Sequence, residues 1–206
     1  MKKDEQKTNA IRFLEQKKID FKIHAYSQEE AISGVEVAEV LGQNPDMVFK
    51  TLVTAGKSGN HYVFMIPVAK ELDLKKAAKA VGEKNVEMIK SKELLPLTGY
   101  IHGGCSPVGM KKFFATTIDE TAKNFPTIMF SGGAIGMQVE TSLSELSKVI
   151  RFSTADLTKD EISYQEFTID LQKTDKNTIP SHFCPFFICL RLLNFHVDFK
   201  YFSEVA

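Results

Sequence analysis

Two apolar segments, MVFKTLVTA (residues 47–55) and HYVFMIPV (residues 61–68), are separated only by the short polar connection GKSGN. Segments rich in valine, isoleucine and phenylalanine on either side of a glycine-containing connection are typical of a β-hairpin. Apolar side chains occupy most positions of both segments, which indicates strands that are covered on both faces. The hairpin is therefore expected near the centre of the fold.

Short helices are predicted on both sides of this hairpin, over residues 4–18, 34–41, 71–82 and 91–99. The first carries its apolar residues on one helical stripe, and FKIHAY (residues 21–26) then alternates like a strand. Ser33 is a suitable N-cap for the second helix, and Gly42 and Gly82 suit the left-handed position that ends the second and third. In SKELLPLTG, Pro96 and the final glycine are expected to stop the helix.

Strands are also expected in the second half of the chain, over residues 111–118, 126–133 and 135–141. SLSE (residues 142–145) reads as a capping box that starts one more helix. Strands and short helices thus alternate irregularly, with hairpins as well as crossovers. This pattern predicts a mixed α+β domain and not a doubly wound parallel sheet.

The composition limits the compartment and the partners. The chain has 206 residues, 43% of them hydrophobic, which is enough for the core of one globular domain. Its 26 Lys and Arg balance its 26 Asp and Glu, so a polyanion would have to meet a local patch. The polar N-terminus and the lack of a long apolar run predict a cytoplasmic protein without signal peptide or membrane span. The three cysteines fit no metal motif.

The organisation of the chain is expected to change near residue 160. Residues 1–160 give consistent signals for one domain, whereas residues 161–206 hold seven of the 16 phenylalanines and keep neither helical nor strand periodicity for long. This C-terminal extension has two interpretations. It is either an extension packed on the domain or a non-native tail without a role of its own.

The loop GYIHGGCSPVGMKK (residues 99–112) places His102 and Cys105 three positions apart. A thiolate nucleophile needs a base within hydrogen-bond reach and a setting that lowers its pKa. Catalytic Cys and His residues are usually distant in sequence and adjacent only in space. A small buried thiol in a turn is therefore the favoured interpretation of Cys105.

Two glycine loops, HGGCSPVG and SGGAIG, allow close approach of the backbone to a ligand, although the simpler interpretation is that both are tight turns. The second is followed by a strand-like segment, which argues against dinucleotide binding. Lys50 lies in an otherwise apolar strand. Its side chain either points into water or lies in a pocket that contacts an anion or carbonyl.

Four segments occur together in the order and spacing of one family: FKTLV, LDLKKAAKAVG, KELLPLTGYIHGGCSPVGMKK and TIMFSGGAIGMQVE. Over roughly residues 5–155 the chain resembles the YbaK/EbsC family, the stand-alone relatives of the editing domain of bacterial prolyl-tRNA synthetases. The long glycine-proline-lysine pattern of the third segment is more specific than any glycine motif alone. Within the family, the sequence looks closest to the branch that removes cysteine from proline tRNA.

This resemblance implies a fold, a reaction and partners. The fold would be a mixed, partly open β-barrel of about seven strands surrounded by short helices. The reaction would be cleavage of the aminoacyl ester of mischarged Cys-tRNA(Pro), without metal or cofactor, with the thiol of the substrate attacking its own carbonyl. The partners would be the 3′ CCA end of aminoacylated tRNA and, as a further expectation, prolyl-tRNA synthetase.

The resemblance also implies site residues. Lys50 would be the central catalytic lysine, anchoring the 3′-terminal adenosine or its phosphate and polarising the ester. Gly103 and Gly104 would give the backbone close access to the aminoacyl group. The implied substrate-binding residues are Tyr26, Thr51, Ser131 and Gln138.

Two positions depart from the pattern of the family. Ala134 and Ile135 stand where relatives often carry a basic residue, which puts phosphate contact in that loop in doubt. Gln138 stands where some relatives have a small or acidic residue, so its role is open. Besides the deacylase, two hypotheses remain: a non-catalytic protein that binds a nucleotide or small molecule in the same cleft, and a hydrolase built on Cys105. Retention of Lys50 and Tyr26 favours the deacylase.

Overall fold

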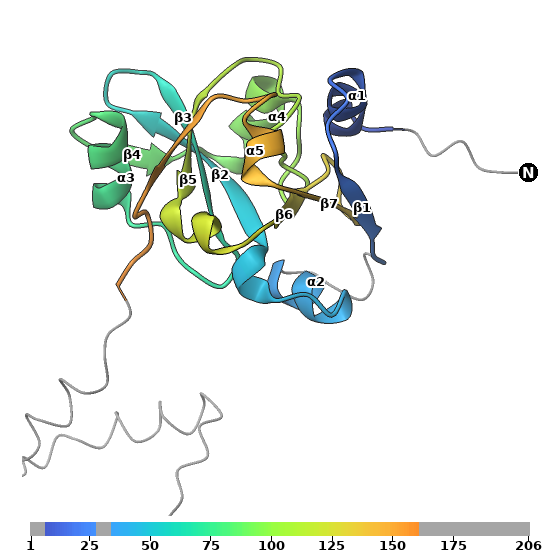
Figure 1. The fold of residues 1–206 in the computed structure, drawn as a ribbon. Coiled ribbons are helices and arrows are strands. Elements are labelled where there is room, and N and C mark those ends of the chain that lie inside the picture. The colour runs from blue at the N-terminus through green and yellow to red at the C-terminus, as the bar shows by residue number, and fades with distance from the viewer. Residues whose placement is uncertain (1–6, 28–33, 161–206) are drawn as a thin grey trace, which may run out of the picture. The chain divides into compact units, whose positions relative to one another are not determined.

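A computed structural model describes residues 7–27 and 34–160 of the chain. Helices and strands alternate irregularly along these residues, which confirms the mixed α+β class (Figure 1). In chain order they are α1 (Asn9–Gln16), β1 (Lys22–Ala25), α2 (Gly34–Val40), the 3₁₀ helix η1 (Pro45–Met47), β2 (Phe49–Gly56), β3 (His61–Pro67), α3 (Leu74–Val81), β4 (Val86–Met88), α4 (Ser91–Thr98), β5 (Ala115–Asp119), the 3₁₀ helix η2 (Glu120–Asn124), β6 (Ile128–Ser131), β7 (Met137–Thr141), α5 (Leu143–Leu146) and β8 (Phe152–Ala155).

The strands form two sheets. The larger sheet has the order β4-β2-β3-β5-β8, with the predicted antiparallel hairpin β2–β3 at its centre and β5 and β8 parallel to β3. The smaller sheet is antiparallel, in the order β1-β7-β6. One isolated parallel bridge, between Val48 and Met129, links the two sheets. The described strands thus form two open sheets, and the expected partly open barrel is not confirmed.

Helices cover the sheets on different sides (Figure 1). The main core holds α1 against β2, β3, β6 and β7, and its fully buried members include Leu14, Met65 and Phe130. A second cluster packs α3 against the other face of the larger sheet through Ala77 and Phe64. A third cluster packs α2 onto the bridge between the sheets. Its buried members are Ala38, Val48, Val68 and Met129.

Capping residues explain where most helices begin and end. The Asp73 carboxylate accepts hydrogen bonds from the first backbone N–H groups of α3, and Gly82 ends that helix in the left-handed conformation, as predicted. Ser142 accepts a hydrogen bond from the backbone N–H of Glu145 and so starts α5, as its capping-box position predicts. Ser33, the expected N-cap of α2, lies outside the described residues.

Three sequence predictions about secondary structure were wrong in detail. Pro96 does not stop α4, because the proline lies inside the helix and Gly99 ends it with φ of 86°. The strand expected from residue 111 begins at Ala115, because residues 111–114 form a loop in which Phe113 is 93% exposed. Strand β4 was not predicted, since three residues are too few to show a period.

The expected C-terminal extension, residues 161–206, lies outside the described residues, so the domain boundary at 160 stays a prediction. Within the described part of the chain, no helix has both the length and the apolar character needed to cross a bilayer.

Candidate functional site

The pairing of four strands places Lys50 at the level of three polar residues from the smaller sheet. Ser131 of β6 is paired with Gln138 of β7, and Gln138 is paired with His24 of β1. An isolated parallel bridge pairs Val48, which directly precedes β2, with Met129 of β6, and extending this register by two residues aligns Lys50 with Ser131. Side chains two apart on a strand, and side chains of paired residues, lie on the same face. Lys50, Ser131, Gln138 and His24 therefore form one row on one face, called the Lys50 row below.

Lys50 is half-buried on this face. Its ammonium group donates a hydrogen bond of 3.0 Å to the carbonyl oxygen of Val68. Burial lowers the pKa of Lys50 from its ordinary value, and the carboxylate of Glu71 acts in the opposite direction. A partly desolvated cation in this position interacts more strongly with an anion or a polarised carbonyl than a surface lysine would.

Gln138 contributes an unsatisfied polar atom to the row. It is 6% exposed, and its side-chain oxygen is buried without a hydrogen-bond partner among the described residues. Buried polar atoms in folded proteins nearly always have a partner. The unsatisfied oxygen of Gln138 therefore marks this row as a place where the described residues provide no hydrogen-bond donor.

The two glycine loops pack against each other beside the row. A Cβ at Gly104 would lie 3.2 Å from backbone atoms of Ala134 and Ile135, and a Cβ at Gly103 would lie 3.5 Å from the Ile135 side chain. Within the second loop, Ser131 accepts a 3.2 Å hydrogen bond from the backbone N–H of Gly133. Only a residue without a side chain fits at 104 without moving the neighbouring loop.

Helix α1 holds the second glycine loop in place. The hydroxyl of Thr8, the N-cap of α1, donates a hydrogen bond of 2.5 Å to the carbonyl oxygen of Gly132. A Cβ at Gly133 would lie 2.9 Å from the Tyr100 ring. Contacts from residues distant in sequence thus fix this loop at the end of β6.

The other two sequence candidates lie near the row but not in it. The backbone N–H of Tyr26, which directly follows β1, donates to the carbonyl oxygen of Gly136, so Tyr26 adjoins the second glycine loop. Thr51 follows Lys50 in β2, so its side chain points to the opposite face, where Phe49 and Val53 belong to the main core. The Thr51 hydroxyl is buried without a hydrogen-bond partner among the described residues.

Sequence reasoning missed a hydrogen-bonded His–Glu contact beside the row. Nε2 of His24 lies 2.8 Å from Oε2 of Glu140, and the hydroxyl of Thr127 donates to the other carboxylate oxygen at 2.9 Å. The hydrogen bond from His24 is the main cause that lowers the pKa of Glu140, with Thr127 and Lys22 adding to it. The period of two would have placed Glu140 on the same face of β7 as Gln138, whereas its contact with His24 depends on the pairing of β1 with β7.

Cys105 is unsuited to nucleophilic catalysis. Its side chain is 7% exposed, and burial raises the pKa of the thiol to about 12. His102 is exposed, in the same loop. Because a thiol with this pKa is protonated at neutral pH, the structure supports the sequence interpretation of a buried structural thiol.

A cavity of about 960 Å³ opens elsewhere on the domain, and none of the seven predicted site residues lines it. Across residues 7–27 and 34–160, no three His, Cys, Asp or Glu side chains gather closely enough to hold a metal ion. We place the candidate site at the Lys50 row because an unsatisfied polar atom, a half-buried cation and the close glycine loops occur there together.

Comparisons with known proteins identify the family of the chain. The family model described as the aminoacyl-tRNA editing domain matches residues 28–149. A candidate Cys-tRNA(Pro)/Cys-tRNA(Cys) deacylase of Enterococcus faecalis, EbsC, is 45% identical over 161 residues, which are 78% of this chain and 98% of that protein.

Solved structures show the same fold. The crystal structure of a candidate trans-editing enzyme for prolyl-tRNA synthetase is 25% identical and superposes with a TM-score of 0.67, covering 74% of this chain and 96% of that one. A hypothetical protein of known structure, 22% identical, also gives a TM-score of 0.67 over 73% of this chain and 99% of its own. The family match and the identity to EbsC together show that the chain belongs to the aminoacyl-tRNA editing domain family, in its YbaK/EbsC branch.

Proposed function

We propose that the protein is a trans-editing deacylase that cleaves the ester between cysteine and tRNA(Pro). The observation that carries the proposal is the Lys50 row, where a half-buried ammonium lies level with Ser131 and Gln138 and beside two closely packed glycine loops. The name of the 45% identical EbsC supports the same substrate. The protein would act in the cytoplasm, where charged tRNAs are found.

Lys50 would hold the 3′-terminal nucleotide and polarise the ester carbonyl. An ammonium group has three N–H donors, and the Val68 carbonyl accepts one of them. The remaining two can point to a phosphate oxygen or to the oxygen that gains negative charge as the ester is attacked.

The remaining site residues would position the aminoacyl group. Gly103 and Gly104 would bring the backbone of the first loop close to the aminoacyl group, and the Ser131 hydroxyl and the Gln138 oxygen would hydrogen-bond the ester and the α-amino group. Tyr26 would line the pocket at the end of β1. Thr51, whose side chain lies on the other face of β2, would act only through the position of the strand.

The chemical step would use the thiol of the substrate. Its thiolate sulfur attacks the carbonyl carbon of the same residue, a C–S bond forms, the ester C–O bond breaks, and the ribose oxygen takes up a proton. An intramolecular attack on an ester needs mainly orientation and charge stabilisation, which a fixed lysine and rigid loops supply. Prolyl-tRNA synthetase is a second partner that we propose, because it could present its own mischarged tRNA.

The test is a comparison of Cys-tRNA(Pro) with Ser-tRNA(Pro), since serine has a hydroxyl in place of the thiol. We expect the purified protein to release cysteine or its thiolactone rapidly and serine at least about 100-fold more slowly, because the intramolecular nucleophile is lost. Product analysis distinguishes the thiolactone from free cysteine. Binding of both tRNAs without ester loss from either would instead indicate a non-catalytic binding protein.

A further inference from the structure

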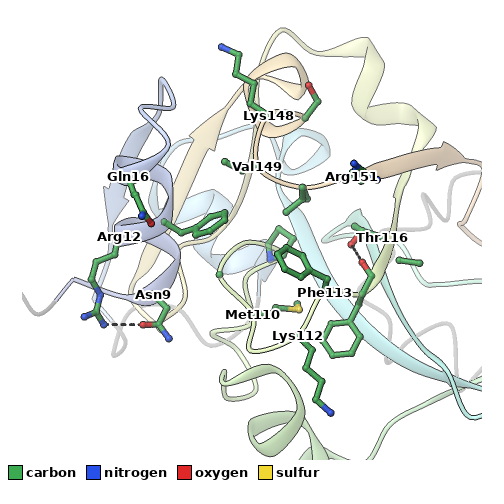
Figure 2. A pocket seen from close by; sticks show the side chains of 17 residues that line it. Asn9, Arg12, Gln16, Met110, Lys112, Phe113, Thr116, Lys148, Val149 and Arg151 are labelled. Atoms are coloured by element: carbon green, nitrogen blue, oxygen red, sulfur yellow. Dashed lines mark hydrogen bonds between the residues drawn. The ribbon is translucent and has the colours of Figure 1, made fainter.

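The 960 Å³ cavity lies away from the Lys50 row and has a composition of its own. Three segments line it: helix α1, residues 107–116 from the loop before β5 and the first two residues of β5, and residues 147–151 between α5 and β8 (Figure 2). Thr116 at its wall pairs with Val63 on β3, whereas Lys50 pairs with Ile66, three residues further along the same strand. That separation is roughly 10 Å along the strand, and the two side chains lie on opposite faces of the sheet.

The rim of the cavity is basic. It includes Arg12, Lys112, Lys148 and Arg151, and no aspartate or glutamate is among its lining residues. Arg12 and Arg151 are the only arginines in the part of the chain that the structure describes. In a chain with equal numbers of acidic and basic residues, this is a local positive patch of the kind that a polyanion requires.

Most of these charges have no ion-pair partner among the described residues. Arg12 donates a 3.0 Å hydrogen bond to the neutral side chain of Asn9, visible in Figure 2. Lys148 forms an ion pair with Glu145, so its charge is partly compensated. For Arg12, Lys112 and Arg151, the described residues show no ion pair. Arginine is the residue best suited to bind phosphate through two parallel hydrogen bonds.

The cavity also presents aromatic side chains. Phe113 is 93% exposed, next to Lys112, and Phe13, Phe114 and Met110 line the wall behind the basic rim. Phe113 contributes little to the core, and together with the neighbouring apolar side chains it forms a contiguous apolar surface inside the basic rim. Unpaired nucleobases stack on such rings, and aromatic groups among basic groups are typical of single-stranded nucleic-acid sites.

We propose that this cavity is a second tRNA-binding site, which takes an unpaired nucleotide with its base against Phe113 and its phosphates on Arg12 and Arg151. This inference rests on the proposed deacylase function, because it assumes that tRNA is the substrate. The site would bind the tRNA and leave the ester chemistry to the Lys50 row. It would let this small domain bind tRNA more tightly than contacts with the 3′ end of the tRNA alone would allow.

The experiment measures binding of uncharged tRNA(Pro) by fluorescence anisotropy at several salt concentrations. The variant Arg12→Gln/Arg151→Gln is compared with the control Lys57→Gln/Lys79→Gln, which removes the same charge from exposed positions outside the cavity. We expect the arginine variant to bind about 10-fold or more weakly, with a salt slope smaller by about two, and the control to bind as the wild type does. Phe113→Ala should weaken binding by roughly 5-fold or more at all salt concentrations.

The kinetic readout separates this site from the catalytic one. With Cys-tRNA(Pro), the arginine variant should raise KM and leave kcat unchanged. Equal tRNA binding by the arginine variant and its control would overturn the proposal. The proposal would also be overturned if the binding of free AMP depended on the two arginines while the binding of tRNA did not. Because uncharged tRNA carries no ester, the measured tRNA affinity does not depend on whether the protein deacylates Cys-tRNA(Pro).

Discussion

Two opposing effects act on the pKa of the Lys50 ammonium group, and a hydrogen bond fixes its position. Burial lowers its pKa, while the hydrogen bond to the Val68 carbonyl fixes its position and the Glu71 carboxylate favours its charged form. A cation that is already partly stripped of water and already oriented costs less to engage with a substrate. This argument applies to Lys50 and not to the exposed lysines of α3.

At the scale of single residues, the account predicts that Cys105 takes no part in catalysis. The Cys105→Ser variant should deacylate Cys-tRNA(Pro) within about 2-fold of the wild type, because the thiol is buried with a pKa of about 12. Peptide mapping by mass spectrometry after iodoacetamide treatment at pH 8 should find Cys105 alkylated only after unfolding. Rapid alkylation that abolishes activity would restore the cysteine-hydrolase hypothesis.

A second residue-scale prediction concerns pH and Glu140. The hydrogen bonds from His24 and Thr127 hold the pKa of Glu140 below its ordinary 4.5 in the folded protein. The ionised carboxylate therefore stabilises the fold above pH 4.5, and this stabilisation is lost as the pH falls through the folded value. Thermal unfolding from pH 7 to pH 3 should show Glu140→Gln less stable than the wild type at pH 7, with the difference shrinking at low pH. A constant difference would contradict this assignment.

At the scale of elements, the two glycine loops act as one unit because their backbones touch. Gly104→Ala should lower the free energy of unfolding by about 1–3 kcal/mol, since the added Cβ would lie 3.2 Å from the backbone of Ala134 and Ile135. It should also reduce kcat for deacylation by displacing the loops. Denaturant titration and single-turnover kinetics measure the two effects.

The control for this variant is Gly42→Ala. Gly42 has φ of 62° and no atom within 4 Å of its added Cβ, so substitution strains only the backbone. It should destabilise the protein without changing kcat. An equal loss of kcat in both variants would show that the activity follows stability and not the contact between the loops.

The helices and strands also show how much of the fold could be predicted from the sequence. The hairpin, α3 and the capping box were predicted because their signals are local, resting on alternation, a stripe or a cap. The Lys50 row was not predicted, because it depends on the Val48–Met129 bridge between segments about 80 residues apart. Periodicity within a strand shows which residues share a face and not which strands become neighbours.

The site residues also divide into those that local sequence signals could place and those that depend on the assembled fold. Alternation alone would have separated Lys50 from Thr51, since adjacent residues of a strand point to opposite faces. The contact of Gly104 with Ala134 and the basic cavity around Phe113 required the assembled fold. Family resemblance supplied Lys50 as a candidate, and the structure supplied its neighbours.

At the scale of the whole molecule, residues 7–27 and 34–160 contain the family match apart from a short segment, both sheets and all three described core clusters. Removal of residues 161–206 should therefore leave the unfolding midpoint within about 3 °C of the full chain and deacylation unchanged. Calorimetry and the ester-loss assay check this. An insoluble truncated protein would show that the extension belongs to the core.

The central claim is that Lys50 carries the catalytic effect of the site. The most direct measurement is the single-turnover rate of ester loss from Cys-tRNA(Pro) for the wild type, Lys50→Ala and the control Lys57→Ala, whose lysine is exposed in the loop after β2. Removal of one oriented group that stabilises a developing negative charge typically costs about 10²–10³-fold in rate. We predict a loss of at least about 100-fold for Lys50→Ala and none for Lys57→Ala, whereas a folded Lys50→Ala variant at the wild-type rate would contradict the account.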